Sequence, residues 1–87
     1  MSIPVETIVI ITRRAEEIVF KRLGVRGPIA VKTREYARKI AEAYYSGNRA
    51  IVKAIKDFYL ALGIQEEILN EVEKMVIEVL GLKKPEE

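Results

Sequence analysis

Three glycines in this 87-residue chain stand in the same local context. Each follows a leucine and precedes an aliphatic residue, in the triplets at 23–25, 62–64 and 80–82. Helices commonly end on a residue in the left-handed conformation, which glycine adopts without steric cost, and a following aliphatic side chain folds back onto the last turn. The pattern therefore predicts three helix ends. Because the glycines are separated by 39 and then 18 residues, with no other shared pattern, we do not interpret them as an internal repeat.

A fourth break comes at residues 46–48, where Gly47 is predicted to end one helix and Asn48 to cap the next. Between the breaks, apolar residues recur every three or four positions, as on one side of a helix. The sequence thus predicts an all-α fold, a compact bundle of four short helices at about 4–23, 28–46, 48–62 and 65–80, with a frayed tail at 82–87. Residues 1–87 are expected to form a single helical domain, because chains of this length hold one core.

Each of the last three helices has an apolar stripe that is expected to face the core. For the helix at 28–46 the stripe is Ile29, Thr33, Ala37, Ile40 and Tyr44. For the helix at 48–62 it is Ile51, Ile55, Phe58 and Leu62, flanked by Val52 and Tyr59. For the helix at 65–80 it is Ile68, Leu69, Val72, Val76, Val79 and Leu80.

The helix predicted at 4–23 has more apolar surface than one neighbouring helix covers. Its core line is Val5, Ile8, Thr12, Ala15, Val19 and Leu23, and further apolar side chains are added by Val9, Ile10, Ile11 and Ile18. Either this helix is central in the bundle, or its excess surface docks on another subunit. The residues expected at such a protein interface are Val9, Ile10 and Ile18.

A second interpretation exists for the start of this helix. β-branched residues favour strands, so residues 7–12 could pair as a short strand. A proline near the start, the Ala-Glu-Glu sequence at 15–17 and the glycine at 24 favour one continuous helix instead. We therefore predict a helix over the whole segment.

The chain lacks the side chains that enzymes most often use for catalysis. It contains no histidine and no cysteine, which removes the commonest general base, the thiolate nucleophile and the usual zinc, iron or copper ligands. Glu67 and Glu71 stand one turn apart, but Lys74 lies about a turn further on, so a solvated helix face is favoured over a metal site. We expect no enzymatic activity, no cofactor and no metal.

The composition bears on location. The densest apolar run, at residues 8–11, is too short for a membrane span, and no basic and apolar leader precedes it. The absence of cysteine fits a reducing compartment, so we expect a cytoplasmic protein with no membrane partner. Heavy use of Glu, Lys, Arg and Ile, with few Asn and Gln, is typical of heat-adapted proteins.

Charge is distributed unevenly along the sequence. Residues 1–56 carry 12 Lys or Arg against 5 Glu, whereas residues 57–87 carry 3 Lys against 8 acids. A basic region of this kind is one indication of nucleic-acid contact. The residues expected to make it are Arg34, Arg38, Arg49, Lys53 and Lys56. The alternative interpretation is that they are solubilising side chains, many of them paired within their own helix.

These patterns favour a non-enzymatic helical interaction protein, an accessory subunit that docks on a larger protein partner or forms a homo-oligomer. The alternative is a nucleic-acid-binding regulator or architectural protein. A role in replication or transcription machinery would use both surfaces. The tyrosines at 44, 45 and 59 are candidates for the rim of a protein interface.

Overall fold

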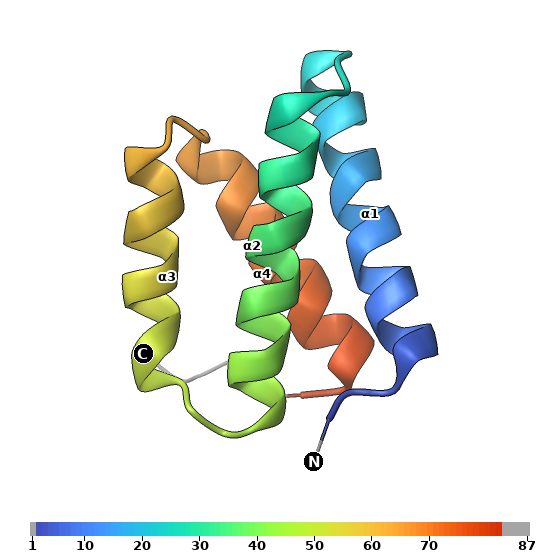
Figure 1. Ribbon diagram of the computed structural model, residues 1–87, viewed down its shortest axis with the longest axis vertical. Coiled ribbons are helices and arrows are strands. Elements are labelled where there is room, and N and C mark those ends of the chain that lie inside the picture. Colours follow the sequence, from blue (N-terminus) through green and yellow to red (C-terminus); the bar gives the residue numbers. More distant parts are fainter. Residues whose placement is uncertain (1, 83–87) are drawn as a thin grey trace.

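The computed structural model describes residues 2–82, which form four helices and no strand (Figure 1). The helices are α1 (Val5–Leu23), α2 (Pro28–Tyr45), α3 (Ala50–Ala61) and α4 (Glu66–Leu80). The predicted all-α bundle of four helices is confirmed, and residues 7–12 are helical rather than a strand. Of the predicted tail, Leu82 packs against the core, and residues 83–87 lie outside the described part of the chain.

Glycine caps end the helices as the repeated triplets predict. Gly63 and Gly81 have φ angles of 99° and 70°, a region that residues with a Cβ rarely occupy. The amide of Ile64 donates to the carbonyl of Tyr59 at 3.2 Å, and that of Leu82 donates to Ile77 at 3.0 Å. These are the six-to-one bonds of the Schellman motif. Ile64 is buried, as expected of an aliphatic side chain folded back onto the helix end.

The predicted cap at Asn48 is wrong. Helix α3 begins at Ala50, and no side chain caps its first turn with a hydrogen bond. The amide of Asn48 instead donates to the carbonyl of Ala43 at 2.9 Å, which closes the end of α2. Asn48 therefore belongs to the termination of α2, because Gly47 at a φ of 79° turns the chain back over that helix.

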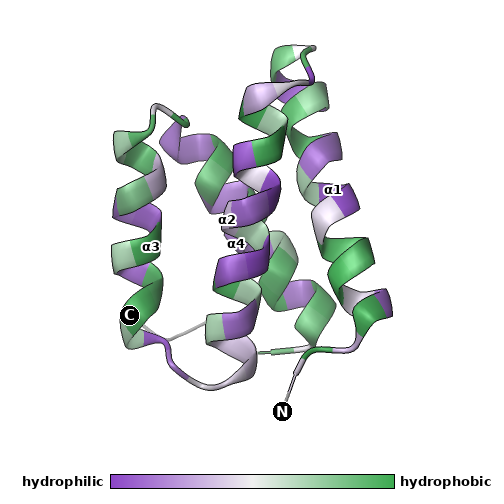
Figure 2. Cartoon of the chain, in the orientation of Figure 1, coloured by the Kyte–Doolittle hydropathy of each residue, from purple (hydrophilic) through white to green (hydrophobic). Residues whose placement is uncertain are grey.

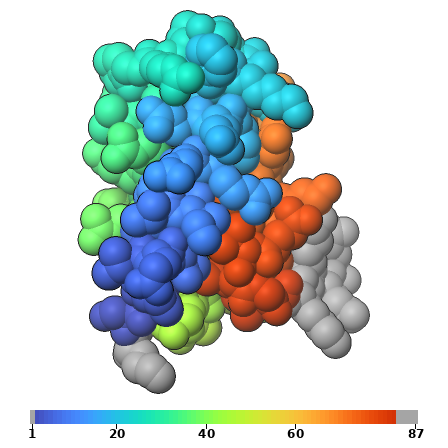
Figure 3. Space-filling model, turned by 90° about the vertical axis from the view of Figure 1, so that its right-hand side faces the viewer, coloured from blue at the N-terminus to red at the C-terminus, as the bar shows by residue number. Residues whose placement is uncertain are grey.

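Helix α2 lies at the centre of the arrangement and contacts each of the other three helices. Helices α1 and α3 lie on its two sides, without contacting one another, and α4 crosses behind it (Figure 1). Seen from the side in Figure 3, α1 covers the molecule between α2 and α4. Helix α3 packs mainly on α2 and only slightly on α4, so it is the most weakly covered of the four.

The core comes mostly from α2 and α4. Most of the stripe predicted for α2 is buried, at Thr33, Ala37, Ile40 and Tyr44. In α1 the buried residues are Ile11, Ala15 and Val19, whereas Val5, which we placed in the core line, is 73% exposed. Val5 precedes Ile11 by six residues, which places the two side chains about a third of a turn apart around the helix. Val5 therefore faces away from the core. Figure 2 shows hydrophobic and hydrophilic residues interspersed along each helix.

Candidate functional site

An exposed apolar surface lies along α3. Ile51, Phe58 and Leu62 are 43%, 56% and 42% exposed, and they share one side of the helix. Ala54 on the same side is also exposed, and Ile55 is partly exposed. We call these five residues the α3 face. The predicted core stripe is wrong for Ile51, Phe58 and Leu62, whereas Ile55 is partly buried against the core.

The core contact of α3 lies to one side of the predicted stripe. Its buried residues are Val52 and Tyr59, seven positions apart and therefore on the same side of the helix. Both were predicted only as flanking residues. Helix α3 is apolar around more than half of its circumference, with its charged residues gathered on the remaining part. One apolar side meets α2, and the other, the α3 face, is left to solvent.

Two shallow hollows adjoin the α3 face in the groove between α2 and α3. The first, of about 260 Å³, is lined by Lys39 of α2 and by Ile51, Ala54, Ile55, Phe58 and Tyr59 of α3. The second, of about 450 Å³, is lined by Lys39, Glu42, Ala43, Ser46, Asn48, Ile51 and Ile55. Lys39 and Glu42 are the charged residues in these linings, so the groove is apolar with a charged edge along α2.

A polar cluster holds α3 to the helices behind it. Glu73 of α4 accepts a hydrogen bond from the Tyr44 hydroxyl at 2.5 Å and pairs with the Lys56 ammonium at 2.7 Å. The same ammonium donates to Asn70 Oδ1 at 2.8 Å. Glu73 and Lys56 are both about four-fifths buried, so their charges are less screened by solvent than those of a surface pair. The cluster joins α2, α3 and α4.

Burial shifts the ionisation of three tyrosines in this region. Desolvation raises the pKa of Tyr44 above its ordinary value, and the hydrogen bond to Glu73 raises it further. Desolvation also raises the pKa of Tyr36, with a smaller contribution from the Glu73 carboxylate. The pKa of Tyr59 is raised by burial and then by Glu35, whose carboxylate accepts its hydroxyl at 3.4 Å. The Tyr36 hydroxyl is buried without a hydrogen-bond partner among residues 2–82.

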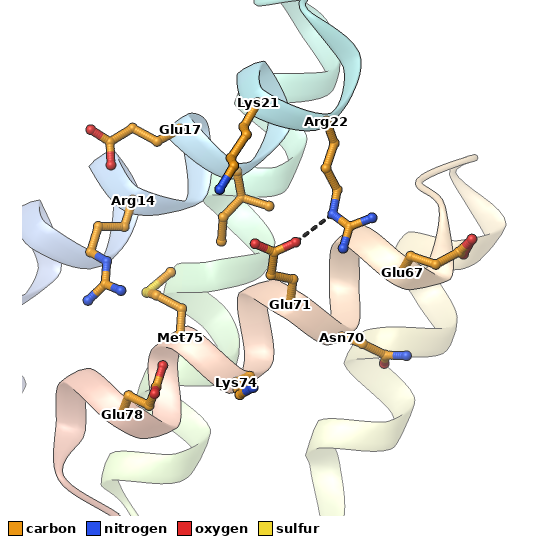
Figure 4. A pocket seen from close by; sticks show the side chains of 11 residues that line it. Arg14, Glu17, Lys21, Arg22, Glu67, Asn70, Glu71, Lys74, Met75 and Glu78 are labelled. Atoms are coloured by element: carbon orange, nitrogen blue, oxygen red, sulfur yellow. Dashed lines mark hydrogen bonds and ion pairs between the residues drawn. The ribbon is translucent and has the colours of Figure 1, made fainter.

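Another hollow, of about 750 Å³, lies between α1 and α4 (Figure 4). Its charged lining contains Arg14, Lys21, Arg22 and Lys74, together with Glu17, Glu67, Glu71 and Glu78. Cations and anions are equal in number, and Arg22 forms an ion pair with Glu71 across the cleft. The positive and negative charges of the cleft therefore balance, so it favours neither an anionic nor a cationic ligand. We interpret it as a solvated contact between two helices.

The predicted interface residues of α1 do not form one surface. Val9 and Ile10 are 43% and 48% exposed, whereas Ile18 is partly buried against the core and lines the cleft with α4. Val9 and Ile18 are nine residues apart, which is two and a half turns and places them on opposite sides of the helix. Nearby, the guanidinium of Arg26 covers the exposed ring of Phe20 at 4.3 Å.

The predicted nucleic-acid residues fall into two groups. Arg34 and Arg38 line a hollow between α1 and α2. Lys53 and Lys56 lie on α3, on the other side of α2, and pair with Asp57 at 3.0 Å and with Glu73. The remaining cation, Arg49, lies over the ring of Tyr44 at 5.5 Å. The structure thus brings Arg49 and Lys56 to one cluster and leaves the α2 arginines elsewhere.

Among residues 2–82, no three acidic side chains are grouped so that they could hold a metal ion, and Glu67 and Glu71 line the mixed-charge cleft. No helix of this part of the chain has the length and hydropathy needed to cross a membrane. Comparison with known proteins found no matching family model, no matching curated protein and no matching solved structure. Function must therefore be inferred from the surfaces of the molecule itself.

Sequence reasoning missed the α3 face as a functional surface because it assigned four of these five residues to the core. The signal was present in the composition of the helix. In α3 all charged residues lie on one part of the circumference, which leaves an apolar arc wider than a single helix contact covers. Helix α1 also has an excess of apolar residues, but they are scattered around its circumference.

Proposed function

We propose that this chain is a non-enzymatic protein-interaction domain, an accessory subunit that docks on its protein partner through the α3 face. The observation that carries the proposal is the exposure of Ile51, Phe58 and Leu62 along one side of a helix whose other apolar side is already packed. Contiguous exposed apolar surface on a small domain is typical of a binding site.

The setting of the α3 face supports this assignment. It has a large aromatic side chain, Phe58, near its centre, and aromatic residues are enriched where interfaces are fully buried. Charged residues flank it, Lys39 and Glu42 on α2 and Asp57 on the far edge of α3. An apolar centre with a polar rim is the usual anatomy of a protein interface.

The other exposed apolar residues have weaker support as the docking site. Val9 and Ile10 are adjacent in sequence and therefore point about 100° apart on α1. Ile18 already packs against the core. A partner that covered all three would have to surround α1, which α2 and α4 prevent by packing on it.

Nucleic-acid binding also has less support than protein docking. A phosphate-binding surface needs cations that are available in one place. Lys56 is engaged by Glu73 and Asn70, Lys53 pairs with Asp57, and Arg34 and Arg38 lie beside α1. These five residues therefore do not form one basic surface for the phosphate backbone of a duplex.

Site-specific crosslinking tests the proposal. A photoreactive phenylalanine analogue would replace Phe58 in one variant and Phe20 in another, because both rings are exposed, at 56% and 45%, on different helices. In cells that express the chain, crosslinked species are expected from position 58 and not from position 20. Either a second copy or a different protein at position 58 supports docking through the α3 face. No product at position 58, or equal products from both positions, would refute it.

A further inference from the structure

We infer that the occupant of the α3 face is a second copy of this chain, with the two α3 helices packed antiparallel about a two-fold axis near Ile55. This inference rests on the proposed function and specifies its partner. Three features of the surface carry it, namely the absence of charge on the face, the charges along its α2 edge and the position of its hollows.

The α3 face is compatible with contact against itself. A two-fold interface places the same surface on both sides, so a charge near its centre would meet an identical charge. The five residues of the face are all uncharged. Pairing two copies therefore buries apolar side chains on both sides without desolvating an ionised group.

The far edge of α3 does not oppose this contact. Lys53 and Asp57 are each two residues from Ile55, so they lie about 160° around the helix from it. They pair with each other at 3.0 Å within the helix, away from the proposed axis.

The edge of the face along α2 becomes complementary to itself when the two α3 helices are antiparallel. It carries one cation, Lys39, and one anion, Glu42, and both line hollows shared with Ile51 and Ile55. An antiparallel two-fold contact sets the two α2 edges against each other with their directions reversed. Lys39 of each copy then faces Glu42 of the other copy. A parallel arrangement would instead bring the α2 edge of each copy onto the far edge of α3.

The hollows lie where the projecting side chains would enter them. Phe58 is three residues beyond Ile55, so the axis brings it level with Val52 of the second copy, where the hollow between Ile51 and Ile55 opens. Leu62 is seven residues beyond Ile55 and comes level with Asn48, which lines the second hollow. The surface therefore carries both the projections and the recesses of one self-complementary contact.

The expected affinity follows from the size of the contact. Helix α3 has 12 residues, and at about 1.5 Å for each residue it is about 18 Å long. With the adjoining edge of α2, such a contact lies at the lower end of the range for specific interfaces, about 1,200 Å² in total. A dissociation constant on the order of micromolar is expected.

Sedimentation equilibrium of the purified chain tests the inference, at low ionic strength because exposed ion pairs are screened by salt. The wild-type chain is expected to form a dimer that dissociates on dilution. Glu42→Lys places lysines of the two copies together along the α2 edge and should weaken dimerisation by about 10-fold or more. The double change Lys39→Glu and Glu42→Lys restores opposite charges and should restore the dimer. Lys21→Glu, on α1, is the matched control and should have no effect.

Disulfide trapping gives a second measurement, which reports how close the two α3 faces come. The chain contains no cysteine, so Ala54→Cys introduces a single thiol on the α3 face near the proposed axis. Oxidation is expected to link two copies rapidly, whereas Arg13→Cys on exposed α1 should link them slowly. Circular dichroism confirms that each variant remains helical.

Several results would overturn the inference. They are a wild-type chain that stays monomeric at millimolar concentration, a dimer unaffected by Phe58→Asp, and a double charge swap that fails to restore association. If the purified chain is monomeric while position 58 crosslinks to a different protein in cells, the second copy is refuted and the proposed function stands. If position 58 crosslinks to nothing, both fail.

Discussion

The ring of Tyr59 packs edge-on against the ring of Tyr36, with the centroids 5.5 Å apart. This contact joins α3 to α2, and both side chains are buried. The neighbouring ring of Phe58 lies edge-on to Tyr59 at 5.2 Å but projects into solvent. These two consecutive aromatic residues therefore lie on different sides of α3. Tyr59 faces the core, and Phe58 belongs to the exposed α3 face.

Truncation of these two neighbours should have unequal effects on stability. Tyr59→Ala removes a buried ring and is expected to lower the free energy of unfolding by about 3 to 5 kcal/mol. Phe58→Ala removes a mostly exposed ring and should cost less than about 1.5 kcal/mol. Urea unfolding, at concentrations where the chain is monomeric, checks both. Equal losses would show that the α3 face is packed rather than free.

Removing a tyrosine hydroxyl should have opposite effects at two positions in the core. The Tyr36 hydroxyl has no partner among the described residues, so Tyr36→Phe relieves a desolvated group and should raise the free energy of unfolding by up to about 1 kcal/mol. Tyr44→Phe deletes the hydrogen bond to the Glu73 carboxylate and should lower it by about 1.5 to 3 kcal/mol. Urea titration measures both variants. A destabilised Tyr36→Phe protein would indicate a buried partner for that hydroxyl.

The positions of the helices were predictable from the sequence because they depend on local chemistry. Glycine at a left-handed position followed by an aliphatic residue determines a helix end through bonds within about six residues, as at Gly63. The core stripe of α2 was predictable for a related reason. Charged residues occupy most of its outward side, so only one apolar stripe is available to face the core.

The orientation of α3 was not predictable in the same way. Its apolar arc is wide enough for two stripes, one through Ile51 and Phe58 and one through Val52 and Tyr59. Which stripe faces the core depends on groups distant in sequence, the ring of Tyr36 and the carboxylate that holds Lys56. Periodicity indicates that such a helix is amphipathic but does not identify its partner. The candidate docking surface was therefore misassigned to the core.

Substitution of the glycine between α3 and α4 should measure the strength of a cap. Gly63→Ala forces a residue with a Cβ to a φ of 99°, although no atom lies close enough to clash with that Cβ. The cost therefore arises from backbone strain, and we expect a loss of about 1 to 2 kcal/mol. Thermal unfolding monitored by circular dichroism checks it. Gly63→Asn, which tolerates the left-handed region better, should lose less. An unchanged midpoint in the alanine variant would contradict the cap.

Alkaline pH should destabilise the fold through its buried tyrosines. In the unfolded chain a tyrosine ionises with a pKa of about 10. Burial raises the pKa of Tyr36, Tyr44 and Tyr59 in the folded state, so the folded protein retains protons that the unfolded chain releases. Stability is therefore complete below pH 10 and falls as the pH rises above it, by up to about 1.4 kcal/mol for each pH unit and each such tyrosine.

Tyr44→Phe separates this effect from general alkaline unfolding. The variant is less stable at neutral pH, but its free energy of unfolding should fall less steeply above pH 10, because one group that binds a proton only in the folded state is gone. Urea unfolding at successive pH values measures the slope, and the ultraviolet absorbance of phenolate follows ionisation directly in the native protein. Identical slopes in the variant and the wild type would mean that Tyr44 ionises equally in both states. The hydrogen bond to Glu73 would then not raise the pKa of Tyr44 in the folded protein.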